Sequence, residues 1–158
     1  MSSTVYPCYD NQFSVYANTL NTPAFVNIAN CTTFGVSINN GVEEWNAYES
    51  EGWLSRLMTA KNVVISVSAK RTPGDDGNDF ISGLAFVNGH YAEANFKWQF
   101  PLTQGQSSPA SITFNNAIIN VKNLGGVDAP NVALLEFDVM SNGKPTATPA
   151  VIVDPETH

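Results

Sequence analysis

One ten-residue stretch, YAEANFKWQF from Tyr91 to Phe100, constrains the fold of this chain most strongly. Apolar and polar residues alternate along it with a period of two, which gives a β-strand one apolar face and one wet face. A half-buried strand of this kind is typical of an antiparallel sheet that packs a core on one side. The apolar residues are Ala92, Ala94, Phe96, Trp98 and Phe100, and the polar residues are Glu93, Asn95, Lys97 and Gln99.

Four further stretches show strand-like alternation, and only 13% of the residues are charged, so we expect a mainly β fold. The phase of the alternation changes at Asn115-Asn116, which predicts a bulge or bend there. Segments near Phe13–Ala17 and Val151–Val153 are expected to add two strands. The four stretches are FGVSIN from Phe34, NVVISVSAK from Asn62, SITFNNAIINVK from Ser111 and LLEFDVM from Leu134.

The stretch AKRTPGDDGNDFISGLAF, from Ala69 to Phe86, predicts a turn that leads into a helix. Asp75 or Asp76 is the candidate N-cap, and Asp79 lies where negative charge favours the helix dipole. The carboxylate spacing does not match a calcium loop, and no Gly-Lys-Ser/Thr follows the glycines as in a phosphate loop. The helix should continue through Phe80, Ile81, Leu84, Ala85 and Val87 and stop at Asn88-Gly89.

The acidic stretch VEEWNAYESEGW, from Val42 to Trp53, is interpreted as a solvated loop. We expect its part near Glu43 to Gly52 and the two termini to be mobile in the free chain and ordered by neighbouring molecules. Paired carboxylates beside aromatic residues could also indicate a glycosidase, but the loop is the favoured interpretation. The following residues, GWLSRLMT from Gly52, predict a short amphipathic helical turn that pairs Trp53 with Leu57 and Leu54 with Met58.

Few residues offer catalytic or metal chemistry. The histidines are His90, in an expected turn, and His158, at the end of the sequence. We therefore predict no catalytic residues, no metal and no cofactor. Cys8 and Cys31 are expected to be free thiols, because no secretion signal accompanies them.

The formal net charge is −7, and all seven basic residues lie between Arg56 and Lys144. Tight binding to nucleic acid needs basic groups that displace counterions, so this class of function is disfavoured. No apolar run approaches the ~20 residues of a membrane span, and we expect no membrane anchor. The protein is expected to be made in a cytoplasm.

Several motifs, in order, carry a family resemblance over about 34–149. They are EEW at Glu43, GW before RLMTAK, the KR…GDDGNDF loop, FKWQFP, and VMSNGKPTATP from Val139. In this order they resemble the major tail tube proteins of long-tailed bacteriophages, or the inner tube protein of a related phage-tail-like bacteriocin.

The resemblance implies an antiparallel β-sandwich or half-barrel with one flanking α-helix, in a single domain over 1–158. Such subunits form hexameric rings that stack into a hollow tube, through which viral DNA passes or which penetrates an envelope. Segments 1–33 and 145–158 would contact neighbouring subunits. The implied partners are other copies of the chain, tape-measure, tail terminator and baseplate proteins, and a sheath. The implied location is a virion tail or tail-like particle assembled in the bacterial host cytoplasm.

Within a tube, the polar row Glu93, Asn95, Lys97 and Gln99 is the candidate lumen-facing surface, because a wall needs one face for water and one for the core. Similar polar rows run through Ser66, Ser68 and Lys70 and through Glu136 and Asp138. Two other functions remain open at this point. One is a monomeric β-sandwich that binds carbohydrate through Trp45, Trp53 or Trp98, and the other is a hydrolase built on the acidic stretch.

Overall fold

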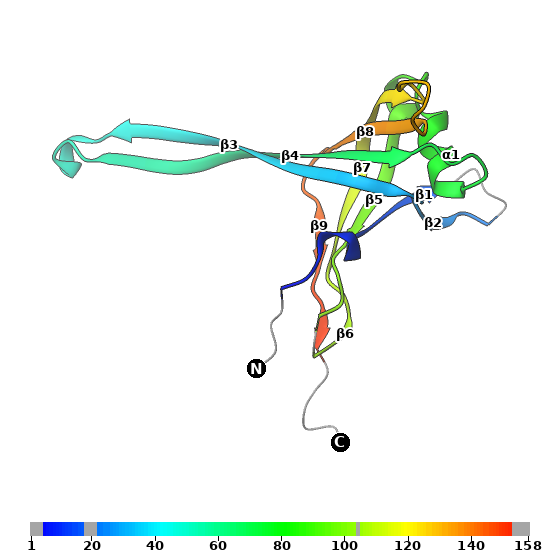
Figure 1. The fold of residues 1–158 in the computed structure, drawn as a ribbon. Helices are drawn as coiled ribbons and strands as arrows, with labels where there is room; N and C mark the ends of the chain where they lie inside the picture. The colour runs from blue at the N-terminus through cyan, green and yellow to red at the C-terminus, as the bar shows by residue number, and fades with distance from the viewer. Residues whose placement is uncertain (1–4, 18–21, 104, 153–158) are drawn as a thin grey trace.

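The computed structural model describes residues 5–17, 22–103 and 105–152. Strands dominate the described chain, and the fold is mainly β with one flanking α-helix, as expected (Figure 1). The helical elements are η1 (Cys8–Asp10), η2 (Tyr48–Ser50), α1 (Asp76–Gly83) and η3 (Gly89–Ala92). The strands are β1 (Gln12–Ala17), β2 (Ala24–Asn27), β3 (Cys31–Asn46), β4 (Leu54–Lys70), β5 (Glu93–Gln99), β6 (Gln106–Ser108), β7 (Ser111–Leu124), β8 (Leu134–Met140), β9 (Thr146–Thr148) and β10 (Val151–Ile152).

In the described residues, eight strands form one antiparallel sheet in the order β2-β1-β5-β7-β8-β4-β3, with β9 paired to β7. The short strands β6 and β10 form a separate two-stranded ribbon. All the strands that the alternation predicted are present, and the antiparallel sheet is confirmed. The sheet curls around a core on one side, and α1 covers part of that side (Figure 1).

The core consists of side chains that alternate inward from five strands, together with Ile81 of α1 and Ile28. Phe96 of β5 and Phe137 of β8 are both fully buried, and their rings meet edge to face at 6.3 Å between centroids. Trp98 is half-buried beside Phe13 and Phe34. The predicted inward face of β5 is therefore correct for Ala94, Phe96 and Trp98, whereas Ala92 belongs to η3.

The predicted bulge in β7 is confirmed. Phe96 pairs with Phe114 and Ala94 with Ala117, so Asn115 and Asn116 together lie opposite Asn95. Asn116 has a left-handed backbone with φ of 54°, and its N–H donates to Asn95 Oδ1 at 2.9 Å. The extra residue explains why the core-facing positions change phase between Phe114 and Ala117.

Two expectations about helices were wrong. The helix α1 ends at Gly83, so Leu84, Ala85 and Val87 lie in the turn that follows it. Backbone bonds from Leu84 to Ile81 and from Ala85 to Ser82 tighten this end, and the apolar side chains after it line a groove instead of a helix face. The predicted helical turn from Gly52 to Thr59 is also wrong, because residues from Leu54 onward belong to β4.

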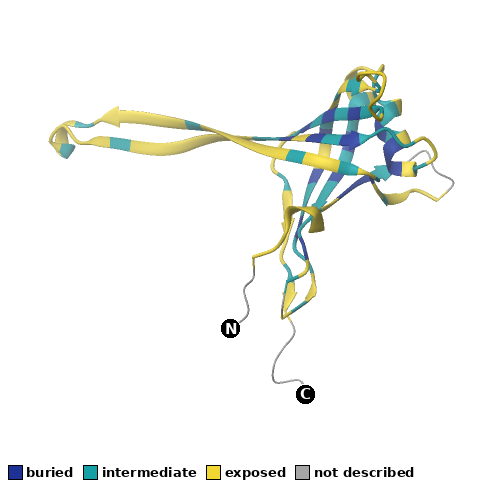
Figure 2. Cartoon of the chain, viewed as in Figure 1, coloured by how far each residue is buried: buried dark blue, intermediate teal, exposed yellow. Residues whose placement is uncertain are grey.

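The acidic stretch is not a loop over its whole length either. Residues up to Asn46 continue β3, and only Ala47–Trp53 form the turn between β3 and β4. The two strands project far beyond the body as a long hairpin (Figure 1). Buried residues gather in the body, and exposed residues cover the projecting hairpin (Figure 2).

Candidate assembly surfaces

The projecting hairpin is the most unusual surface of the subunit, and we call its part beyond the body, residues 39–62, the arm. Within the body β4 pairs with both β3 and β8, but the β8 partners end at Val64. Along the arm, β3 and β4 pair only with each other among the described strands, and no side chain of the arm is buried. A two-stranded hairpin alone is marginally stable in water, and neither a third described strand nor the core supports the arm.

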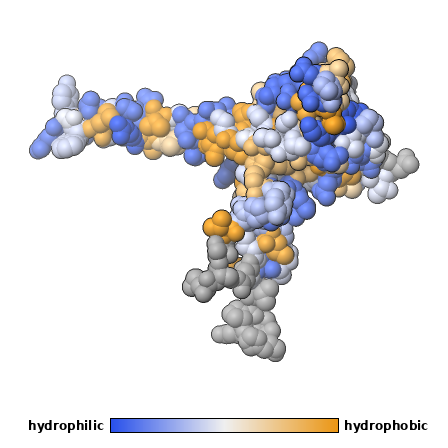
Figure 3. Space-filling view, viewed as in Figure 1, coloured by the Kyte–Doolittle hydropathy of each residue, from blue (hydrophilic) through white to orange (hydrophobic). Residues whose placement is uncertain are grey.

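Both faces of the arm carry apolar side chains. Val42 lies opposite Met58 on one face, whereas Trp45 and Leu57 lie on the other face. These four side chains are between 44% and 59% exposed. Orange apolar patches accordingly run along the arm in the space-filling view (Figure 3). Exposed apolar surface on this scale is typical of a protein contact site, and two apolar faces suit a segment that neighbours enclose from both sides.

The arm holds few polar interactions that could replace those contacts. Glu44 and Arg56 form an ion pair at 3.5 Å, but both side chains are at least half exposed. An exposed pair of this kind contributes about 0–1 kcal/mol. The acidic residues that suggested a hydrolase are therefore exposed and distributed along the projecting hairpin.

Hydrogen bonds of the GDDGNDF segment connect α1 to the neighbouring strands and loops. Asp75 is the N-cap of α1, and its Oδ2 accepts hydrogen bonds from the N–H of Asn78 at 2.9 Å and from the N–H of Ala29 at 3.1 Å. Asp76, the other candidate cap, is the first residue of the helix. Asp79 accepts a hydrogen bond from Arg71 at 3.0 Å. Two of the three carboxylates thus bind protein donors.

Asn78 completes this junction and was missed by sequence reasoning. Its side chain is fully buried, accepts from Arg71 Nη1 at 2.7 Å and from the Thr72 N–H at 3.1 Å, and donates to the Lys70 carbonyl at 3.0 Å. In the described part of the chain, no group of three or more His, Cys, Asp or Glu side chains is placed to hold a metal ion. The polar side chains of this segment thus form hydrogen bonds that hold α1 in place beside the sheet.

The polar row of β5 lies on the face of the sheet opposite the core. Glu93 pairs with His90 at 3.1 Å, Asn95 binds the β7 bulge, and the Lys97 ammonium lies 5.9 Å from the centre of the Phe25 ring. Gln99 lies opposite Gln12 and Ser111 in neighbouring strands. Four half-buried side chains therefore form part of a polar surface.

The other two polar rows belong to the same surface. Glu93 pairs with Ile118 of β7, and Ile118 pairs with Met140 of β8, so these three side chains point to the same face. Asn120 and Asp138 lie two residues further along β7 and β8 and therefore point to that face too, as does Ser66 of β4, which pairs with Asp138. Ser66 donates to Asp138 at 2.7 Å, and Lys122 pairs with Asp138 at 3.0 Å. The three alternatives offered by the sequence are thus parts of one face, with the charges Lys70, Lys97, Lys122, Glu93, Glu136 and Asp138.

The aromatic residues considered for carbohydrate binding do not form one platform. Trp98 packs in the body, where its indole N–H donates to Asn11 Oδ1 at 3.0 Å and its ring lies 4.5 Å from that of Phe100. Trp45 and Trp53 belong to the arm. Trp98 therefore does not share one surface with the two tryptophans of the arm.

The two cysteines differ in their surroundings. Cys8 is exposed, whereas Cys31 is half-buried and its thiol approaches the Ile28 carbonyl at 3.5 Å. Burial, with a smaller effect from the Asp75 carboxylate, raises the pKa of Cys31 to about 11.

The described residues include no helix that is long and apolar enough to span a membrane.

No family model matches this sequence, and no curated protein matches it. Solved structures do match its fold. The tail of an empty gene transfer agent (GTA) particle, with C6 symmetry, has a TM-score of 0.63 at 15% identity, over 91% of this chain and 99% of that chain. A PVC sheath/tube terminator of an extracellular contractile injection system has a TM-score of 0.64 at 14% identity, over 94% and 99%.

A structure of the anti-feeding prophage (AFP) baseplate contains a third similar chain, with a TM-score of 0.63 at 13% identity, over 94% of this chain and 98% of that chain. The curled antiparallel sheet, the single α-helix of the described residues and the projecting hairpin therefore form a tail tube protein fold. Its structural neighbours are components of phage-like tails and contractile injection systems.

Proposed function

We propose that this chain is a structural subunit that assembles with copies of itself into a hollow tail tube. The observation that carries the proposal is the arm, which exposes apolar side chains on both faces and has no support within its own subunit. Subunits in such a tube form hexameric rings, and the rings stack. The C6 symmetry of the similar GTA tail supports this arrangement.

The sheet edges also favour assembly. Among the described strands, β2 and β3 end the main sheet, and each leaves one edge without a strand partner. Open edges invite pairing with another chain, and a heterologous contact repeated by rotation closes into a ring. Strands of neighbouring subunits could therefore continue one wall around the bore.

Within the tube, the polar face of the sheet is the proposed lining, with Glu93, Asn95, Lys97 and Gln99 as its β5 row. Three basic and three acidic side chains balance on this face, while the chain as a whole carries a net charge of −7. A lining without excess positive charge would hold no polyanion tightly. This supports a bore through which DNA moves in transit, or a headless tube that penetrates an envelope.

The proposed tube is a single tail tube domain over 1–158 in each subunit, without enzymatic activity. Its proposed partners are tape-measure, tail terminator, baseplate and sheath proteins, because similar chains occur in terminator, baseplate and sheath-tube assemblies. The proposed location is the virion tail or a tail-like particle, assembled in the bacterial host cytoplasm. The segments 1–33 and 145–158 are proposed to contact neighbours, although Phe13 and Val15 of β1 lie in the subunit's own core.

Electron microscopy of the purified full chain, with a six-fold reconstruction, tests this proposal. Rings or tubes with the β5 row on the inner wall are the expected result. Tubes with this row on the outer wall would overturn the lining alone. A chain that stays monomeric at every concentration would overturn the tube.

A further inference from the structure

We propose that the tip of the arm of one copy docks in a groove between the end of α1 and strand β7 of a second copy. This inference rests on the self-assembly proposed above and adds the receiving site. The tip is the segment Ala47–Trp53, and the groove is the cavity of about 660 Å³ beside His90. The two surfaces lie on opposite sides of the molecule, because the arm leaves the body away from α1 (Figure 1).

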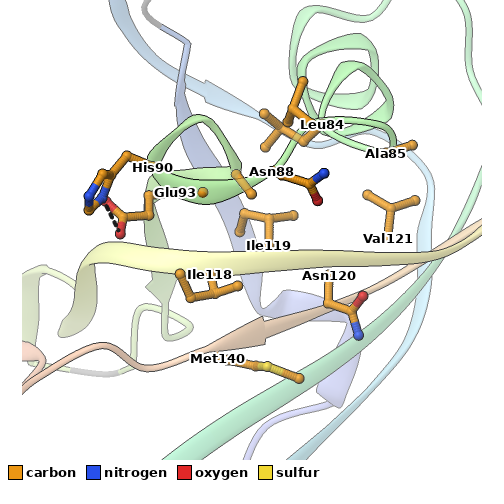
Figure 4. A pocket seen from close by; sticks show the side chains of 13 residues that line it. Leu84, Ala85, Asn88, His90, Glu93, Ile118, Ile119, Asn120, Val121 and Met140 are labelled. Carbon is orange, nitrogen blue, oxygen red and sulfur yellow. Dashed lines mark hydrogen bonds and ion pairs between the residues drawn. The ribbon is translucent and has the colours of Figure 1, made fainter.

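The groove exists because two elements end early. The first residue of β5, Glu93, lies opposite Ile118, so the following residues of β7 have no strand on that side. The chain after α1 passes over this edge and leaves a hollow. Leu84, Ile119 and Val121 lie around the hollow on one side of β7, and Asn88 adds a side-chain amide there, whereas Asn120 points to the other side of the strand (Figure 4).

The tip presents two aromatic side chains with no cover. Tyr48 is fully exposed and Trp53 is 75% exposed. The turn that carries them is well hydrogen-bonded, because the Ser50 hydroxyl donates to the Ala47 carbonyl at 2.8 Å and the Trp53 N–H donates to the Ser50 carbonyl at 3.0 Å. An aromatic pair held by such a turn loses little conformational entropy on docking.

The chemistry of the two surfaces is complementary. Tyrosine and tryptophan combine a large apolar body with one polar group, and they form the anchors of many protein interfaces. The groove offers an apolar lining for the rings and the Asn88 amide for the phenol hydroxyl or the indole N–H. Among the described residues, the Asn88 side-chain amide has no hydrogen-bond partner in its own subunit.

The geometry also produces an open chain of contacts. Each copy carries one such tip and one such groove on opposite sides, so a docked copy leaves its own tip free for the next copy. This is a heterologous contact, which propagates as a ring or a stack. A self-complementary contact between two tips would stop at a dimer.

Disulfide crosslinking of the full chain tests the contact, with Cys8→Ser to remove the exposed native thiol. One variant adds Glu49→Cys on the tip and Asn88→Cys at the groove, and the control adds Glu49→Cys with Ser108→Cys on β6. All these positions are exposed. Diamide is the oxidant, which takes two electrons and two protons from each thiol pair as the sulfur-sulfur bond forms and is itself reduced to the hydrazine.

The tip-groove variant should give a ladder of covalent dimers, trimers and longer species on a non-reducing gel. The control should give at most dimers, as should Glu49→Cys and Asn88→Cys introduced singly. If electron microscopy shows rings or tubes but the tip-groove variant gives no ladder, the docking site is wrong and the proposed function stands. If the chain neither assembles nor crosslinks, both are wrong.

Discussion

At the scale of single residues, Asp75 has the widest structural effect. One carboxylate oxygen accepts from the first turn of α1 and from the backbone of Ala29, which lies 46 residues earlier in the chain. Gly77 makes this close approach feasible, because a Cβ at that position would collide with the Asn27 carbonyl. The sequence predicted the cap, but the bond to Ala29 joins distant segments and has no local signal.

Replacing Asp75 by alanine should lower the free energy of unfolding by about 1–3 kcal/mol, because the helix cap and the Ala29 bond are both lost. Urea denaturation of the monomeric chain measures this change. Asp76→Ala is the matched control, and it should cost less than about 0.5 kcal/mol because its carboxylate caps nothing. Equal losses for the two variants would contradict the stabilisation assigned to the helix cap and the Ala29 bond together.

The second residue-level prediction concerns Cys31. Because its pKa rises from 9.0 to about 11 in the folded chain, its thiol should resist maleimide at pH 8, while exposed Cys8 reacts quickly. Mass spectrometry of the alkylated protein gives the modified positions, with the urea-unfolded chain as the control in which both thiols react. Rapid labelling of Cys31 in the folded chain would contradict this placement.

The same shift has a defined effect on stability. The unfolded thiol loses its proton near pH 9, whereas the folded thiol keeps it to about pH 11. Between these values the folded state binds more protons, so stability must fall as pH rises. Well below pH 9 both states keep this proton, so Cys31 adds no pH dependence to the free energy of unfolding there.

At the scale of elements, the alternation of apolar residues predicted the body well and the arm poorly. In β5 and β8 one face packs on the core, so period two is visible in the sequence. In the arm, Leu54, Leu57 and Met58 follow a spacing that resembles a helix, because both faces of the hairpin carry apolar residues and Thr59 has no opposite residue at a bulge. The sequence of such a strand therefore lacks the period-two pattern that a single buried face produces.

The bulge of β7 gives an element-level prediction. Asn116 holds a left-handed backbone with φ of 54°, which a β-branched residue tolerates poorly. Asn116→Val should therefore lower the free energy of unfolding by about 1–2 kcal/mol, whereas Asn116→Gly should be close to neutral. Thermal unfolding of both variants measures the difference. Two equally stable variants would contradict the bulge.

The arm gives the second element-level prediction. Replacing residues 42–59 by Asn-Gly, a favoured two-residue hairpin turn, joins the paired residues Gly41 and Ala60 directly. The shortened chain should keep its circular dichroism spectrum and lose its assembly, because the core includes no residue of the arm. Sedimentation velocity measures the oligomeric state. Unfolding of the shortened chain would show that the arm supports its own subunit.

At the scale of the whole molecule, the two faces of one curled sheet have different roles. Its inner face and α1 form the core, and its outer face presents a balanced set of charges. The sequence predicted both faces of β5, but the union of the three polar rows on one face depends on long-range strand order, which no local pattern contains. The groove was missed for the same reason, since it forms where elements distant in the sequence meet.

The central claim is that the arm exists for contact between copies, and cryo-electron microscopy of the full chain beside the arm-shortened chain tests it most directly. The account predicts stacked six-fold rings around a hollow bore for the full chain, with each arm enclosed by neighbouring subunits. It predicts folded monomers for the shortened chain. Full-length monomers, or tubes in which the arms remain exposed to solvent, would contradict the claim.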